Sequence, residues 1–164
     1  MTPLQIYLLG VPRFEREDGP IRFTRKKSIA LLAYLATTAQ PHSRDALATM
    51  LWPEHDQSAA RANLRRELSR IKSTLGNEPL AIEREQVALN QAEGWWLDVS
   101  SFYAKLTAVQ ENLLKRPASS GVQQTSQYLG ELEDAVAMHS GEFMAGFSLP
   151  DCPQFDEWQF FQRE

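Results

Sequence analysis

Alternating hydrophobic and polar positions open the chain and then give way to helical periodicity. Residues 4–24 form short alternating runs separated by turn residues, which predicts a small antiparallel sheet. Residues 27–38 are apolar at nearly every position and contain no helix breaker, so they predict a helix that is buried on most sides. Ser43 is a natural N-cap for a second helix, which is expected over residues 44–51.

The segment from Ser58 to Leu75 has the clearest periodicity in the chain. At about 100° per residue, its large apolar side chains share one narrow face. This face consists of Ala60, Leu64, Leu68, Ile71 and Leu75. The opposite face carries arginines with small side chains between them, so one side is expected to pack and the other to stay cationic and exposed. Ser58 is the expected N-cap of this helix, and Gly76 is its expected end.

A hairpin pattern and two long helical patterns follow. Residues 79–90 contain two short alternating segments that can pair as a hairpin, which makes them a candidate wing. Residues 98–115 predict a helix capped by Asp98 or Ser100, and residues 121–139 predict another. Two such helices can form one unit of a helical-repeat array.

The order of these elements predicts the fold class. A sheet, a core helix, two further helices and a hairpin follow one another in the order of a winged helix-turn-helix protein. We therefore expect an α+β winged helix-turn-helix domain over residues 1–97 and an all-α segment over residues 98–164.

Charge is distributed unevenly between these two parts. The net charge of −4 arises because residues 99–164 carry −5 and residues 1–98 carry +1. Within residues 58–72, five basic side chains accompany a single acid, Glu67. This local cationic stripe is sufficient for phosphate contacts despite the acidic total.

Composition offers little support for catalysis, metal binding or membrane insertion. Cys152 is the single cysteine, and His42, His55 and His139 are isolated from one another in the sequence. No enzyme activity, cofactor or metal site is therefore expected. The chain contains neither an apolar run of membrane-spanning length nor a secretory signal pattern, so a cytoplasmic location is expected.

The cationic face of the third helix predicts contacts with double-stranded DNA. A helix that reads the major groove needs a supporting helix, a short turn, an apolar underside and a basic outer side, and all four occur in order between Ser43 and Leu75. The expected base-facing positions are Arg65, Arg66, Ser69 and Arg70. The expected phosphate contacts are Arg44, Arg61 and Lys72. Arg84, near the hairpin tip, is expected to reach an adjacent minor groove.

Two other interpretations of the same residues stay open. The cationic face can be an ordinary solvated helix surface. Alternatively, the chain can be a protein–protein interaction module, in which the winged helix does not bind DNA and the aromatic-rich C-terminal half contacts a partner. The order of elements favours DNA binding over both.

Motifs along the chain resemble the streptomycete antibiotic regulatory protein (SARP) family. Residues 43–76, SRDALATMLWPEHDQSAARANLRRELSRIKSTLG, look like the helix-turn-helix of its OmpR/PhoB-type winged helix, and residues 23–40, FTRKKSIALLAYLATTAQ, resemble its strand and core helix. In the second half, LDVSSFYAKL, HSGEFMAGF and FDEW resemble motifs of the bacterial transcriptional activator domain.

This resemblance implies a fold and a set of partners. The second half is implied to be the N-terminal part of a helical domain with tetratricopeptide (TPR-like) repeats. The implied function is transcription regulation through promoter DNA, with homodimers on direct repeats and contact with RNA polymerase as further implied interactions.

Overall fold

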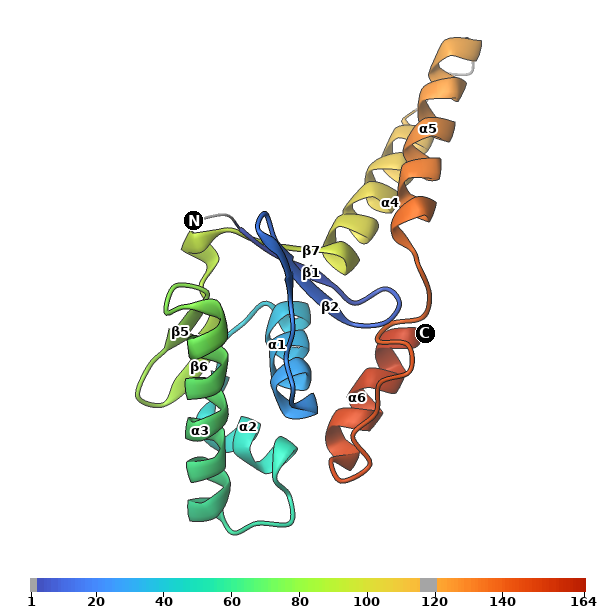
Figure 1. The fold of residues 1–164 in the computed structure, drawn as a ribbon. Helices are drawn as coiled ribbons and strands as arrows, with labels where there is room; N and C mark the ends of the chain where they lie inside the picture. Colours follow the sequence, from blue (N-terminus) through green and yellow to red (C-terminus); the bar gives the residue numbers. More distant parts are fainter. Residues whose placement is uncertain (1–2, 116–120) are drawn as a thin grey trace.

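The computed structural model describes residues 3–115 and 121–164 and builds them into two small sheets and six α-helices (Figure 1). The helices are α1 (Lys26–Thr38), α2 (Arg44–Leu51), α3 (Gln57–Leu75), α4 (Asp98–Leu114), α5 (Val122–Met138) and α6 (Pro153–Arg163). The strands are β1 (Leu4–Tyr7), β2 (Arg13–Arg16), β3 (Gly19–Ile21), β4 (His42–Ser43), β5 (Leu80–Ile82), β6 (Gln86–Leu89) and β7 (Trp95–Leu97). This mixed α/β order is consistent with a winged helix followed by a helical segment. Among the described helices, none combines the length and apolar character needed to cross a membrane.

The first sheet has the strand order β3-β2-β1-β7. Its first three strands pair antiparallel as predicted, with Ile6 opposite Phe14. β7 then lies parallel to β1 and places Leu97 beside Ile6. The sequence did not predict this last pairing, because β7 has only three residues and is far from β1 along the chain. The sheet thereby brings the start of α4 next to β1.

Helices α1 and α3 supply much of the core. The predicted apolar face of α3 is buried, and each of its five side chains is at most 3% exposed. The predicted end of α3 is also confirmed, because the Gly76 N–H donates to the Lys72 carbonyl oxygen at 2.8 Å. Ser43 caps α2 as predicted, with its hydroxyl oxygen accepting from the Ala46 N–H at 3.0 Å.

The predicted N-cap of α3 is wrong. The helix begins at Gln57, so Ser58 lies inside its first turn. Asp56 is the cap instead, and its Oδ1 accepts from the Ala59 N–H at 2.8 Å. A carboxylate at this position both accepts an unpaired amide and complements the positive end of the helix dipole.

The predicted caps of α4 are also wrong, because neither Asp98 nor Ser100 caps it. Asp98, 2% exposed, connects α4 to the loop after β1 instead. Its Oδ1 accepts from the N–H groups of Leu8 at 2.9 Å and Val99 at 2.8 Å, and its Oδ2 accepts from the Leu9 N–H at 2.9 Å. Burial raises the pKa of this carboxyl even though the three amides favour its charged form.

The second sheet contains the predicted wing hairpin. β5 and β6 pair antiparallel, with Leu80 opposite Leu89. β4, which directly precedes α2, pairs with β6 and places His42 opposite Val87. The hairpin is therefore attached to the start of α2 as well as to the end of α3.

The C-terminal segment packs against the first part of the chain. α4 and α5 pair and project away from the sheet, on the opposite side of the molecule from α3 (Figure 1). The chain then returns, and the Met144 N–H donates to the Leu8 carbonyl oxygen at 2.7 Å. α6 packs against α2, with Phe155 fully buried. The domain division between residues 97 and 98 stays a prediction, and the core contains side chains from both sides of it.

Candidate nucleic-acid interface

The outward face of α3 is polar and exposed. Arg65, Arg66, Ser69 and Arg70, the expected base-facing residues, are all exposed. Ala62 and Ser73 lie on the same face, so the crest of the helix carries small side chains between long basic ones. A helix of this shape can enter a major groove, because its backbone can approach the base edges closely.

A cationic groove lies on one side of α3, next to the β5–β6 hairpin. It consists of two adjoining hollows that share Arg44 and Arg65. We call it the wing groove, and its basic side chains are Arg44, Arg61, Arg65, Lys72 and Arg84. Ser69 lines the groove as well, so the fold brings six of the eight candidate residues together from α2, α3 and the hairpin.

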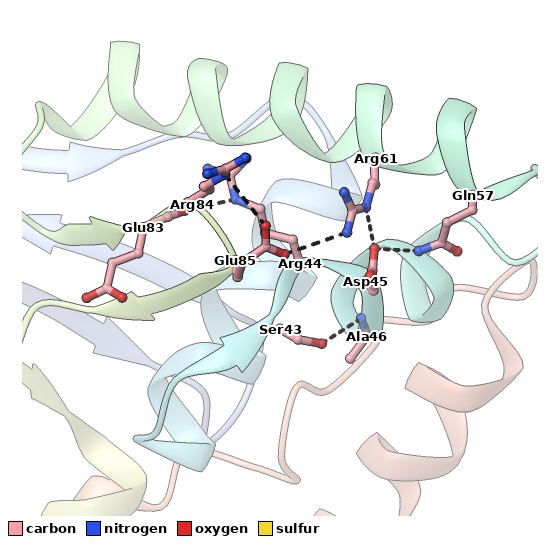
Figure 2. Close-up of polar contacts among 9 residues, drawn as sticks. All are labelled: Ser43, Arg44, Asp45, Ala46, Gln57, Arg61, Glu83, Arg84 and Glu85. Atoms are coloured by element: carbon pink, nitrogen blue, oxygen red, sulfur yellow. Dashed lines mark hydrogen bonds and ion pairs between the residues drawn. The ribbon is translucent and has the colours of Figure 1, made fainter.

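Acidic neighbours balance much of the charge of Arg61 in the wing groove, as Figure 2 shows. Its Nε donates to Asp45 Oδ1, and its Nη2 lies 3.8 Å from Glu85 Oε2. The Gln57 amide also donates to Asp45 Oδ1, at 2.6 Å. These hydrogen bonds, the one from Arg61 foremost, lower the pKa of Asp45, and the carboxylate raises the pKa of Arg61 in return.

Arg44 and Arg84 both lie at the hairpin tip (Figure 2). The Arg44 Nε donates to the Glu83 carbonyl oxygen at 3.0 Å, which ties the start of α2 to the tip. The Arg84 side chain is 96% exposed, and its Nε lies 4.0 Å from Glu85 Oε1. The Arg84 side chain can therefore reorient toward a ligand, whereas the Arg44 side chain is held against the backbone of the hairpin.

A second cationic hollow lies on the other side of α3, between α3 and the start of α1. We call it the α1 hollow, and its basic side chains are Arg25, Lys26, Lys27, Arg66 and Arg70. The first three are absent from the sequence prediction, because they lie at the start of a helix that was interpreted only as core. The run of three basic residues at 25–27 is the signal that could have identified them.

Glu67 holds Arg70 from beneath. The sequence pattern showed Glu67 only as the lone acid in a basic stripe, yet its side chain is 2% exposed. Its Oε2 lies 3.1 Å from Arg70 Nη1, and its Oε1 accepts from the Ser28 hydroxyl of α1. Position 67 lies at the edge of the apolar face of α3, one helical turn from Ile71, which is why the acid points inward.

The arrangement is consistent with the architecture of a winged helix-turn-helix protein. A buried core helix, a supporting helix, a third helix with a cationic outer face and a hairpin beside it are the parts of that architecture. The chain resembles the solved structure of Mycobacterium tuberculosis EmbR in complex with a low-affinity phosphopeptide, with a TM-score of 0.76 and 23% sequence identity. The similarity covers 98% of the chain described here. At this identity the likeness shows a shared fold, and the chain spans 42% of the EmbR chain. No family model and no curated protein matches the chain.

Proposed function

We propose that this chain is the DNA-binding part of a transcription regulator and that α3 reads the major groove of double-stranded promoter DNA. The observation that carries the proposal is the exposed crest of α3, with basic residues along it and a cationic surface on each side. A major groove has a phosphate strand along each edge, so a reading helix benefits from positive charge on both flanks.

The base contacts are assigned to Arg65, Arg66, Ser69 and Arg70. Arginine can donate two hydrogen bonds to one guanine, and such a contact contributes about 1–3 kcal/mol of discrimination. Glu67 supports this role for Arg70, because a partly fixed guanidinium loses less side-chain freedom when it binds.

Phosphate contacts are assigned to Arg44, Arg61 and Lys72 of the wing groove. Arg61 has to exchange its bonds to Asp45 and Glu85 for a phosphate, so its contribution is smaller than its charge suggests. Arg84 of the hairpin tip is assigned to the neighbouring minor groove.

The test compares specific with non-specific duplex binding. The 164-residue chain is titrated against labelled duplexes from the DNA upstream of its coding region and against random-sequence duplexes. We expect the variant Arg65→Ala/Arg66→Ala to lose most of its preference for the upstream duplex, because both residues are assigned to bases. Thermal unfolding should stay unchanged, since both side chains are exposed.

A matched control removes two charges elsewhere. The control variant is Lys105→Ala/Lys115→Ala. Lys105 lies on α4 and Lys115 directly follows it, and α4 projects away from α3 (Figure 1). This variant should bind the upstream duplex as the unchanged chain does. Equal loss of preference in both double variants, or undiminished preference in the Arg65/Arg66 variant, would refute the assignment.

A protein-interaction module is the second candidate, and α6 supplies the observation for it. Phe160 and Phe161 are 56% and 60% exposed, although large aromatic side chains are usually covered. Under this candidate, the chain would bind no duplex at any salt concentration, and Phe160→Ser/Phe161→Ser would abolish partner binding.

The resemblance to the SARP family extends the proposal to other partners. Two copies on a direct repeat and contact with RNA polymerase are both compatible with a regulator of this kind. A protected region of two equally spaced segments in a footprint of the upstream DNA would support the paired arrangement, and a single protected segment would argue against it.

A further inference from the structure

The α1 hollow is a large surface feature for which the sequence prediction gives no role. Its volume is about 570 Å³, within the range of small-molecule pockets, roughly 300–1,000 Å³. Such pockets are mainly apolar, whereas this hollow has five basic and two acidic side chains among ten lining residues. Its chemistry suits a charged polymer surface better than a small organic molecule.

Charge in the hollow is only partly balanced. The two acids, Glu67 and Asp151, leave an excess of three positive charges. Arg25 makes no ion pair within the described residues. Lys26 Nζ makes a long hydrogen bond of 3.4 Å to the Ser148 carbonyl oxygen, and Arg66 donates only to the neutral Asn63 amide oxygen, at 3.1 Å. These three side chains can turn toward an anion without breaking an ion pair.

The place of the hollow beside α3 indicates which anion it binds. Arg66 and Arg70 belong both to the exposed side of α3 and to the wall of the hollow. The wing groove lies along the opposite side of the same helix. If α3 occupies a major groove, the two phosphate strands that border the groove pass along these two flanks.

We propose that the α1 hollow holds backbone phosphates of the DNA strand on the side of α3 away from the wing, with Arg25 and Lys26 as contacts beside Arg66, which keeps its assignment to a base. This inference rests on the proposed function. It enlarges the DNA interface from the helix-turn-helix and wing to the start of α1.

The C-terminal segment limits the affinity of this site. Asp151, which lies just before α6, is 2.9 Å from Lys27 Nζ and neutralises it at the rim of the hollow. The Asp151 side chain is 57% exposed, so it also faces an approaching phosphate strand. Loss of its charge would release Lys27 for a phosphate contact and remove a repulsion at the same time.

The first experiment measures how duplex affinity depends on salt. Each phosphate contact contributes a slope of about −0.9 to the plot of log K against log salt concentration. We expect Arg25→Gln/Lys26→Gln to make the slope shallower by about 1.8 units and to weaken binding about tenfold to a hundredfold at 0.1 M salt. Upstream and random duplexes should be affected alike, because phosphates carry no sequence. The matched control is Lys105→Gln/Lys115→Gln, which should leave the slope unchanged.

The second experiment seeks a gain of binding, which misfolding cannot imitate. Asp151→Asn should strengthen binding to random duplex several-fold and steepen the slope by up to about one unit. The matched control Asp134→Asn makes the same change of charge on α5, and it should alter neither quantity.

The outcomes separate this inference from the function on which it rests. If the unchanged chain binds no duplex, the proposed function fails and this inference fails with it. If the chain binds duplex but Arg25→Gln/Lys26→Gln behaves like its control, the inference alone is wrong. Saturable quenching of tryptophan fluorescence by pyrophosphate would assign the hollow to a small phosphorylated ligand instead, if the quenching is lost in Trp52→Phe and in Arg25→Gln/Lys26→Gln while the salt slope for duplex is unchanged.

Discussion

The two flanks of α3 are both cationic, but their charges are controlled from different parts of the chain. In the wing groove, Arg61 is balanced by Asp45 of α2 and Glu85 of the hairpin, so the compensating acids come from the same elements as the groove. In the α1 hollow, Glu67 balances Arg70 from inside the core, and Asp151 comes from the C-terminal segment. The wing groove is therefore complete within the first 97 residues, whereas the α1 hollow depends on how the end of the chain packs.

The reactivity of Cys152 tests whether the end of the chain stays packed beside the α1 hollow. Of the predictions below, this one has the largest expected effect. Burial raises the pKa of its thiol to about 11, from an ordinary 9.0. This rise in the pKa leaves about a hundredfold less thiolate at neutral pH. Thiolate is the form that reacts with alkylating reagents. We expect alkylation of Cys152 in the folded chain to be slower than that of an exposed thiol by at least this factor.

An engineered thiol supplies the comparison. Ala104 of α4 is exposed, so Ala104→Cys in a Cys152→Ser background should be alkylated at the rate of a free thiol. Equal rates for the two thiols would mean that residues 149–152 leave the winged helix in solution. The α1 hollow would then lack Asp151, and the contrast between the flanks would disappear.

Glu67 should show the next largest effect. Glu67→Ala leaves the buried Ser28 hydroxyl without its partner and frees Arg70, so we expect the free energy of unfolding to fall by about 1–3 kcal/mol in urea denaturation. Glu133→Ala removes an exposed acid from α5, and its effect should stay within about 0.5 kcal/mol. Arg61→Ala should cost less than Glu67→Ala, because the ion pair in the wing groove is exposed to solvent. A Glu67→Ala chain as stable as the unchanged one would show that the contacts of Glu67 with Ser28 and Arg70 do not stabilise the fold.

The helix and the hairpin that line the wing groove could each be predicted from the sequence, because each is a local element. The buried side of α3 follows from helical periodicity alone, and Leu64 and Ile71 point inward as that period requires. The hairpin follows from two short alternating segments close together in sequence. The position of the hairpin beside α3 does not follow from these patterns, because it depends on the pairing of β4 with β6.

The α1 hollow could not be predicted in this way because three distant segments form it. Arg25, Arg66 and Asp151 meet only after α1 packs against α3 and the C-terminal segment returns to α2. Periodicity reports which side of an element is buried, but it does not report which element covers that side. The same limit applies to Asp98, whose carboxylate was interpreted as a local cap and instead bonds to the backbone of Leu8 and Leu9.

The titration of Asp45 is the most local and the smallest test of the wing groove. Its hydrogen bond from Arg61 lowers the pKa of the carboxyl below its ordinary 3.8, and the bond from Gln57 acts in the same direction. Because the folded pKa is the lower one, the pair stabilises the fold above the ordinary pKa, and this contribution is lost as the pH falls through the folded value. In an NMR titration, Arg61→Gln should move the midpoint of the Asp45 carboxyl upward. Arg84→Gln should leave it in place, because Arg84 approaches Glu85 and not Asp45. An unmoved midpoint in Arg61→Gln would mean that the acid and the arginine are separate in solution, in which case the wing groove carries more uncompensated charge than the α1 hollow.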